Sequence, residues 1–171
     1  NDPDRQALEE RLAGHRVHAG FARHRTGVFV GRNDALATLR ETRATGAQLM
    51  TLLGTAGVGK TRLSKEYALA EQQDYPGGVW FADLSEAHDV LGIVEAVAST
   101  LGVPLTQTDP IQQVGWAIGG RGDMLLVLDN FEQVVEAAAE TVERWLEMAP
   151  AAVILTTSRT PLGLEQETVV P

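Results

Sequence analysis

The pattern G-x-x-x-x-G-K-T occupies Gly54-Thr55-Ala56-Gly57-Val58-Gly59-Lys60-Thr61. An apolar stretch, 48–53, precedes it, and a stretch with helical periodicity, 62–70, follows it. A strand, a glycine-rich loop and a helix in this order are typical of a phosphate-binding loop, in which backbone N–H groups and the helix N-terminus face the phosphates. Together with Arg62 in the first turn of the helix, these eight residues are the ones we expect to contact a nucleotide.

Two side chains of this pattern carry the expected chemistry. Lys60 would reach the β- and γ-phosphates, and the hydroxyl of Thr61 would coordinate Mg²⁺. The competing interpretation is a glycine-rich turn with a solvated lysine. From average composition, the pattern arises by chance in about one chain of this size in a couple of hundred. The flanking strand and helix lower that frequency further, so we favour the phosphate site and list Lys60 among the catalytic residues.

Length and composition agree with one nucleotide-binding domain. The chain has 171 residues, 44% of them apolar, which is enough for a real core. Cysteine is absent, which excludes disulfides and thiolate metal sites. No run approaches the ~18 apolar residues of a membrane span, and no signal peptide is visible. The formal net charge of −9 disfavours a nucleic-acid-binding surface. We therefore expect a cytoplasmic protein without membrane or direct nucleic-acid contacts.

The N-terminal part differs from the rest in charge. Residues 1–33 carry six Arg against four acids, and no acid occurs between Arg11 and Asn33. An arm that contacts an anionic partner is one interpretation; a lead-in helix or linker lying on the acidic body is the one we favour. We divide the chain into an N-terminal helix and basic linker, 1–27, and a nucleotide-binding domain, 28–171. Because it begins at Asn1 and ends in a predicted strand, we expect a fragment of a larger protein.

Apolar strands alternate with amphipathic helices along the domain. The predicted strands are 48–53, 79–84, 124–128, 152–156 and 168–170, and the predicted helices after the loop are 62–70, 90–101, 110–118 and 133–148. Strands and helices alternating at this length predict an α/β fold with a parallel sheet and helices on both faces.

Asp129 is the second candidate for phosphate chemistry. It follows the apolar run Leu125-Leu126-Val127-Leu128, which is the Walker B pattern. Ligands of open parallel sheets bind at the carboxyl ends of the strands, so Asp129 could hold the Mg²⁺ already bound by Thr61. Many buried strands end in Asp for turn reasons alone. The combination with a phosphate-binding loop favours the metal role.

The residues after Asp129 bear on hydrolysis. Many related hydrolases place an acid directly after this Asp, whereas this chain has Asn130, which can orient water but is a poor base. Glu132 is the nearest remaining acid. It either assists hydrolysis or is simply the first-turn acid of the following helix, where the helix dipole favours a negative charge.

Arg159 follows the predicted strand 152–156 through Thr156, Thr157 and Ser158. The polar end of this strand would emerge at the same edge of the sheet as the phosphate-binding loop. Thr156 or Thr157 could then contact water or Mg²⁺, and Arg159 could contact the γ-phosphate and sense its presence. A surface arginine in a turn before Pro161 is the alternative.

Five segments in this order resemble the NB-ARC-like domain of STAND signal-transduction ATPases in large bacterial regulators. They are 29–32, 54–61, 78–84, 126–132 and 154–159. The resemblance implies a P-loop NTPase three-layer α/β/α sandwich with five parallel strands in the order 5-1-4-3-2. It also implies that Val30, Gly31 and Arg32 line adenine and ribose, and that Arg159 is the sensor-1 arginine. Asn33 departs from the Glu usual at its position.

The resemblance implies partners outside these 171 residues. Members of the family continue into helical, winged-helix and repeat domains, and nucleotide-dependent oligomers are possible. We expect a switch that binds ATP or ADP with Mg²⁺ and hydrolyses ATP slowly. A turnover P-loop ATPase or kinase and an adaptor with a structural nucleotide remain the alternatives. The absence of an Asn-Lys-x-Asp guanine-reading motif favours adenine, and the absence of an arginine-rich lid disfavours a kinase.

Overall fold

A computed structural model describes residues 33–55, 57–106 and 108–171 of the chain. The predicted helix at 3–13 and the basic segment as far as Arg32 lie outside the described residues. So do four of the predicted nucleotide contacts, Val30, Gly31, Arg32 and Ala56.

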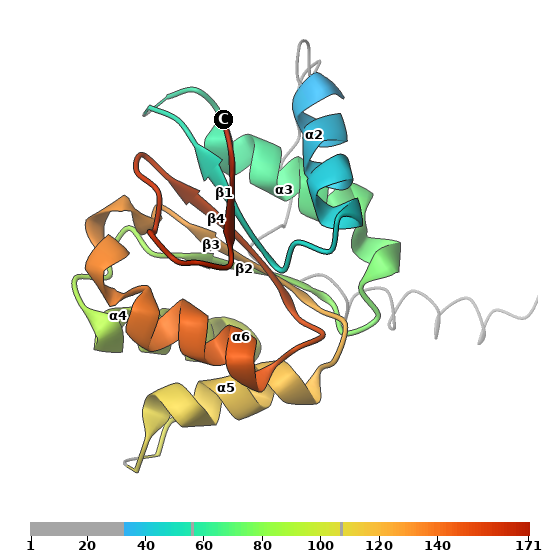
Figure 1. Ribbon diagram of the computed structural model, residues 1–171. Helices are drawn as coiled ribbons and strands as arrows, with labels where there is room; N and C mark the ends of the chain where they lie inside the picture. Colours follow the sequence, from blue (N-terminus) through green and yellow to red (C-terminus); the bar gives the residue numbers. More distant parts are fainter. Residues whose placement is uncertain (1–32, 56, 107) are drawn as a thin grey trace, which may run out of the picture.

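A five-stranded sheet forms the centre of the domain (Figure 1). Its strands are β1 (Leu49–Leu53), β2 (Val79–Asp83), β3 (Leu125–Asp129), β4 (Val153–Ser158) and β5 (Glu167–Val170). Every pairing is parallel, and the order is β2-β3-β4-β1-β5. Read from the other edge, this is 5-1-4-3-2, so the predicted fold class and strand order are confirmed.

Helices cover both faces of the sheet, which makes three layers (Figure 1). On one face lie α2 (Asn33–Ala44) and α3 (Lys60–Ala70), and on the other lie α4 (Val90–Leu101), α5 (Pro110–Gly120) and α6 (Arg144–Met148). A short 3₁₀ turn, η2 (Gln72–Asp74), follows α3. Parallel strands need long crossover connections, and these helices supply them.

Strand β3 shows why two layers of helices are needed. All five of its residues are buried, and its side chains alternate between two separate cores. Leu125 and Val127 pack with α2 and α3, whereas Leu126 and Leu128 pack with α4, α5 and α6. Because both faces are apolar, the strand reads as a continuous apolar run ending in Asp129.

The segment after β3 is not the single α-helix predicted at 133–148. It consists of the 3₁₀ turns η3 (Phe131–Gln133) and η4 (Val135–Ala137), the π-helical η5 (Ala139–Glu143) and the five-residue α6. Its buried residues Phe131, Val134 and Ala137 recur every third position. A 3₁₀ helix places positions three apart on one face, so this spacing suits the observed turns. The prediction of one regular helix was wrong.

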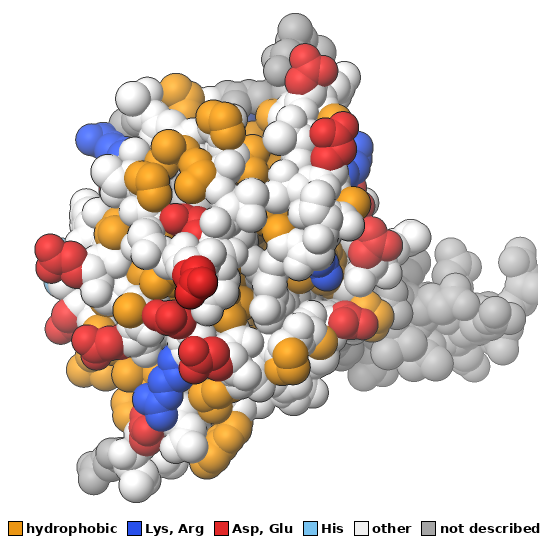
Figure 2. All heavy atoms as spheres, in the orientation of Figure 1, with side chains coloured by type: hydrophobic (Ala, Val, Ile, Leu, Met, Phe, Trp, Pro, Cys, Tyr) orange, Lys and Arg blue, Asp and Glu red, His pale blue; other side chains and the backbone are white. Residues whose placement is uncertain are grey.

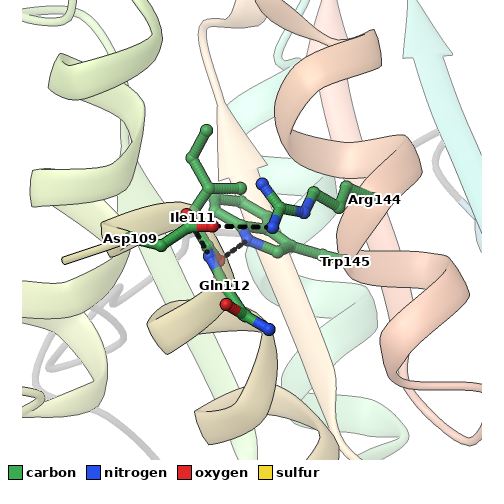
Figure 3. Close-up of polar contacts among 5 residues, drawn as sticks. All are labelled: Asp109, Ile111, Gln112, Arg144 and Trp145. Atoms are coloured by element: carbon green, nitrogen blue, oxygen red, sulfur yellow. Dashed lines mark hydrogen bonds and ion pairs between the residues drawn. The ribbon is translucent and has the colours of Figure 1, made fainter.

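Helices α5 and α6 are joined by polar contacts around Asp109 (Figure 3). Asp109 caps α5 by accepting a hydrogen bond from the backbone N–H of Gln112 at 3.1 Å. The guanidinium of Arg144 donates to the other carboxylate oxygen of Asp109 at 2.9 Å. The indole N–H of the fully buried Trp145 donates to the Ile111 carbonyl at 2.9 Å. The start of α5 at Pro110 agrees with the helix predicted at 110–118, and its cap residue Asp109 also joins it to α6.

On the face shown in Figure 2, acidic side chains are more frequent than basic ones, in line with the net charge of −9. Within the described residues, no helix has both the length and the apolarity that a membrane crossing requires. Among the described residues, four large apolar side chains are exposed: Val58, Leu91 on α4, Trp116 on α5 and Val169 on β5.

Candidate functional site

The glycine-rich loop connects the carboxyl end of β1 to the first turn of α3, as predicted. Gly57 and Gly59 have φ angles of 84° and 86°, which residues with a side chain rarely adopt. At Gly54 a Cβ would lie 2.9 Å from Cγ2 of the exposed Val58, which would have to shift. The backbone path therefore favours glycine at positions 57 and 59.

The amino group of Lys60 lies over this loop. Its Nζ donates hydrogen bonds to the carbonyls of Gly54 and Thr55, the latter at 3.0 Å. Because the lysine side chain is flexible and its charge is concentrated on one amino group, Lys60 can instead donate hydrogen bonds to phosphate oxygens held by the loop.

Thr61 and Asp129, which are 68 residues apart in the sequence, meet at the carboxyl edge of the sheet. The Thr61 hydroxyl lies 3.0 Å and 2.8 Å from the two carboxylate oxygens of Asp129. The hydroxyl of Thr157 on β4 also donates to this carboxylate, and it accepts a hydrogen bond from the backbone N–H of Asn130 at 3.0 Å. Three adjacent elements therefore converge on one carboxylate.

Burial governs the charge of Asp129. Its exposed fraction is 2%, and burial raises the pKa of its carboxyl above the usual value, although the hydrogen bonds from Thr157 and Thr61 act in the opposite direction. The side-chain donors to this buried carboxylate are all neutral, so it gains strongly from a cation.

Asp83 belongs to the same edge, and the sequence reasoning did not select it. It ends β2 directly beside Asp129 in the register of the sheet. The side-chain amide of Asn130 donates to both carboxylates, at 3.0 Å to Asp83 and 3.2 Å to Asp129. Burial raises the pKa of Asp83, but hydrogen bonds from Asn130 and Ser85 outweigh it, so the pKa lies below its usual range. The signal that could have found Asp83 is an acid at the end of the strand next to the Walker B strand.

Asn130 adopts a left-handed backbone conformation with φ of 62°, the single case among the described residues other than glycine. Asparagine tolerates this conformation better than most residues. Its amide orients two carboxylates in this structure. A role of Asn130 toward the attacking water stays a prediction.

Two hollows flank Lys60. One, of about 290 Å³, is lined by Gly57, Gly59, Lys60, Thr61, Asn130 and Glu132. The other, of about 380 Å³, lies on the α2 side of the loop, where Ala35, Leu52, Leu63 and Val58 supply apolar walls. The polar hollow suits phosphates and a cation, and the apolar hollow suits a flat base.

Arg159 comes directly after β4 and is exposed. The carbonyl of the preceding residue, Ser158, accepts a hydrogen bond from the N–H of Gly54 at 3.2 Å. Arg159 is therefore the neighbour in sequence of a residue that contacts the phosphate-binding loop. Arg62 lies in the first turn of α3 and is partly exposed.

These residues fit a nucleotide with Mg²⁺. Among the described residues, no group of three or more His, Cys, Asp and Glu side chains could hold a metal ion. Mg²⁺ typically takes one or two protein oxygens together with water and substrate phosphates. Thr61 and Asp129 provide such a pair beside the loop.

Comparison with known proteins identifies the family of this chain. The model of the AAA domain family matches residues 42–162. An HTH-type transcriptional regulator of Mycobacterium tuberculosis is 39% identical over 125 residues, 70% of this chain and 13% of that protein. An uncharacterized protein of the same species is 31% identical over 153 residues, 88% of this chain and 38% of that protein. The chain therefore spans a minor part of these relatives.

Solved structures agree on the fold. Cdc6p from Pyrobaculum aerophilum superposes with a TM-score of 0.59 at 14% identity, over 82% of this chain and 42% of that chain. A STAND protein with a tetratricopeptide repeat sensor from Pyrococcus horikoshii superposes with a TM-score of 0.52 at 19% identity, over 88% of this chain and 24% of that chain. Likeness at these identities concerns the fold alone. With the phosphate-binding loop, the Walker B aspartate and the family match in place, the chain belongs to the AAA domain family and is a P-loop ATPase domain.

Proposed function

We propose that this domain is an ATP/ADP-dependent switch of the NB-ARC-like STAND type, within a transcriptional regulator, and that it hydrolyses ATP slowly. The observation that carries the proposal is the contact of Thr61 with Asp129 beneath the glycine-rich loop. This pair would hold Mg²⁺, which bridges phosphate oxygens and neutralises charge that develops during phosphoryl transfer.

The two hollows suggest how the nucleotide lies. The phosphates would bind in the polar hollow under Lys60, and the adenine would bind in the apolar hollow between α2 and the loop. The predicted contacts Val30, Gly31 and Arg32 immediately precede α2, which borders that apolar hollow through Ala35.

A switch needs a group that distinguishes ATP from ADP, because a ligand shifts a conformational equilibrium only by its differential affinity for the two states. Arg159 is the residue we assign to this role. It is exposed, cationic and one residue from the hydrogen bond between Ser158 and Gly54. Movement of Arg159 toward a γ-phosphate would be transmitted through β4 to the sheet edge that also holds Asp129.

The partners of the switch would lie in the larger protein. Relatives bearing an HTH-type regulator name and the fold shared with a STAND protein support a role in signal transduction. We propose that helical, winged-helix and repeat domains bind this domain in a nucleotide-dependent way, that oligomers form with the nucleotide state, and that DNA is contacted by other domains. The acidic balance of this chain favours that division of roles.

Calorimetry with a non-hydrolysable ATP analogue and with ADP tests the switch. Arg159→Ala should weaken binding of the analogue about tenfold more than binding of ADP, since a charge-assisted hydrogen bond is worth about 1.5–3 kcal/mol before solvent screening. Arg144→Ala, which removes an arginine on α6, is the control and should leave both affinities unchanged. Equal losses for both nucleotides in Arg159→Ala would remove the sensing role, and no binding to the unaltered protein would refute the proposed function itself.

A further inference from the structure

The loop between β4 and β5, residues 159–166, begins with Arg159, the proposed γ-phosphate sensor (Figure 1). Just before the loop, the Ser158 carbonyl accepts a hydrogen bond from the backbone N–H of Gly54 at 3.2 Å. Further along, the side chain of Leu162 is buried in the core on the α4, α5 and α6 side of the sheet. Arg159 is exposed between these two fixed points. Its position therefore depends on how the loop is held on either side of it.

Glu167, the first residue of β5, holds this loop through its carboxylate. Its Oε2 atom accepts a hydrogen bond from the backbone N–H of Leu162 at 2.8 Å, and its Oε1 atom accepts one from that of Gly163 at 3.2 Å. The backbone N–H of Glu167 donates to the Leu164 carbonyl at 3.1 Å. Hydrogen bonds to an ionised carboxylate are stronger than those between neutral groups. One side chain thus closes the loop on itself.

The same carboxylate reaches into the middle of the sheet. Its Oε2 atom also accepts a hydrogen bond from the hydroxyl of Thr51 on β1 at 2.6 Å, and the Thr51 hydroxyl lies 2.7 Å from that of Thr156 on β4. Both threonines are fully buried. Because Thr51 gives its one hydroxyl hydrogen to Glu167, Thr156 donates to Thr51. Strand β1 leads into the phosphate-binding loop, so Glu167 ties the loop of Arg159 to the strand that carries Gly54.

We propose that Glu167 is a positioning residue for discrimination between ATP and ADP; this inference rests on the proposed function. Glu167 holds Arg159 in a fixed place relative to the phosphate-binding loop, and it acts through the loop without touching the nucleotide. A loop that is already ordered loses less conformational entropy when its arginine binds a phosphate. This advantage concerns only the nucleotide that Arg159 contacts. Loss of the Glu167 carboxylate should therefore weaken binding of ATP more than binding of ADP.

Glu167→Gln removes one acceptor and keeps the size of the side chain. The carboxylate uses one oxygen for the N–H of Leu162 and the other for the N–H of Gly163. An amide has one oxygen and one NH₂ group, so in either orientation the NH₂ group faces a backbone N–H. At least one bond to the loop is lost. Glu165→Gln is the matched control, because Glu165 is exposed, lies in the same loop and undergoes the same change of charge.

Calorimetry with a non-hydrolysable ATP analogue and with ADP measures the discrimination. Glu167→Gln should weaken binding of the analogue about threefold or more relative to ADP, and Glu165→Gln should leave the ratio of the two affinities unchanged. Added to Arg159→Ala, the substitution Glu167→Gln should change this ratio no further, because residues that act as a unit are not additive. A residue that merely stabilised the fold would not show this coupling.

Hydrogen exchange in the nucleotide-free protein tests the anchoring by itself. The amides of Leu162 and Gly163 should exchange about tenfold faster in Glu167→Gln, because local opening of the loop becomes easier, and should be unaffected in Glu165→Gln. Circular dichroism checks that each variant is folded. If Glu167→Gln does not fold, Glu167→Asp takes its place. Its side chain is one methylene shorter and cannot span from the loop to Thr51, so the same two changes are expected.

The outcomes separate this inference from the proposed function. If Arg159→Ala lowers both affinities equally, the sensing role fails and this inference fails with it. If Arg159→Ala lowers the ratio but Glu167→Gln does not, or if exchange at Leu162 and Gly163 is unchanged, the switch stands and Glu167 does not position its sensor. Equal weakening of both nucleotides in Glu167→Gln, or an additive loss in the double variant, would make Glu167 a structural residue and overturn the inference.

Discussion

Two aspartates at the carboxyl edge of the sheet have pKa values that are shifted in opposite directions. Asp129 is buried, with its pKa raised, whereas the neighbouring Asp83 has a lowered pKa because Asn130 and Ser85 donate to it. Asn130 lies between the two and donates to both. One amide therefore bridges two carboxylates of adjacent strands.

Lys60→Ala should abolish nucleotide binding and leave the fold intact. Lys60 donates to the carbonyls of Gly54 and Thr55, and such contacts at a partly exposed loop contribute little to stability, within about 0.5 kcal/mol. Calorimetry with ATP and ADP, together with circular dichroism, measures both effects. Lys65→Ala, on the same helix, makes the same charge change and should lower affinity far less. Unchanged affinity in Lys60→Ala would remove the phosphate assignment.

Asp129→Asn should stabilise the Mg²⁺-free, nucleotide-free protein at pH 7 relative to the unaltered chain. Because the pKa of Asp129 is raised above its usual 3.8 in the folded state, the folded protein holds a proton that the unfolded chain has released. Stability therefore falls as pH rises through the window from 3.8 to the raised folded pKa, and the loss persists above it.

Unfolding temperatures measured from acid to neutral pH for both proteins check this sign. The advantage of Asp129→Asn should shrink as pH falls through the window and disappear below it. Contributions of carboxyl groups distant from Asp129 cancel, since both proteins share them, whereas Asp83 interacts with Asp129 and its contribution changes with the substitution. If the higher unfolding temperature of Asp129→Asn instead grew toward acid pH, the raised pKa of Asp129 would not be its cause.

At the scale of elements, close packing of α5 on α6 holds the layer beneath β3. A Cβ at Gly115 of α5 would lie 2.4 Å from Sδ of Met148 and 3.2 Å from Cδ1 of Trp145. Gly120 ends the same helix, and a Cβ there would meet no atom within 4 Å. The helix therefore requires glycine at one position for the approach of α6 and tolerates a side chain at the other.

Gly115→Ala should destabilise the domain by about 1–3 kcal/mol, the usual cost of overpacking, with Met148 able to relieve part of it. Gly120→Ala should be neutral or stabilising by at most about 1 kcal/mol, because alanine has the higher helix propensity. Chemical denaturation followed by circular dichroism compares the two. Similar effects of both substitutions would mean that close packing of α6 on Gly115 does not contribute to stability.

At the scale of the whole molecule, we expect the site to combine a phosphate-binding loop with slow hydrolysis. The residue after the Walker B aspartate is Asn130, whose amide is occupied by Asp83 and Asp129. The nearest remaining acid, Glu132, lies in a short 3₁₀ turn that begins after the left-handed Asn130. Such a site suits a domain that holds its nucleotide and changes state slowly.

The chain 1–171 should hydrolyse ATP well below the ~1–100 s⁻¹ of dedicated phosphoryl-transfer enzymes. No arginine finger is assumed from a second molecule, and exposure of the loop to water weakens each electrostatic contact with the phosphates. Phosphate release under saturating Mg-ATP measures the rate, with Lys60→Ala as the blank. A blank-corrected rate above about 1 s⁻¹ would favour a turnover ATPase over the switch.

The sequence by itself determined the features that depend on local pattern. The loop at 54–61, the strand ending in Asp129 and the alternation of strands with helices are read from neighbouring residues, and the structure has all three. The meeting of Thr61 with Asp129 was also predictable, because the carboxyl ends of parallel strands share one edge. The strand order came from the family resemblance, since periodicity carries no information about which strands pair.

Only the tertiary structure decided what depends on contacts between distant segments. Asp83 joins the site because β2 pairs with β3, 47 residues separate it from the amide of Asn130, and no local pattern links the two. The irregular turns at 131–143 replace a regular helix because the buried side chains follow the shape of the core beneath them. The burial of Glu132 Oε2 arises in the same way. Packing of one segment on another sets these features, and packing overrides helix propensity wherever the two disagree.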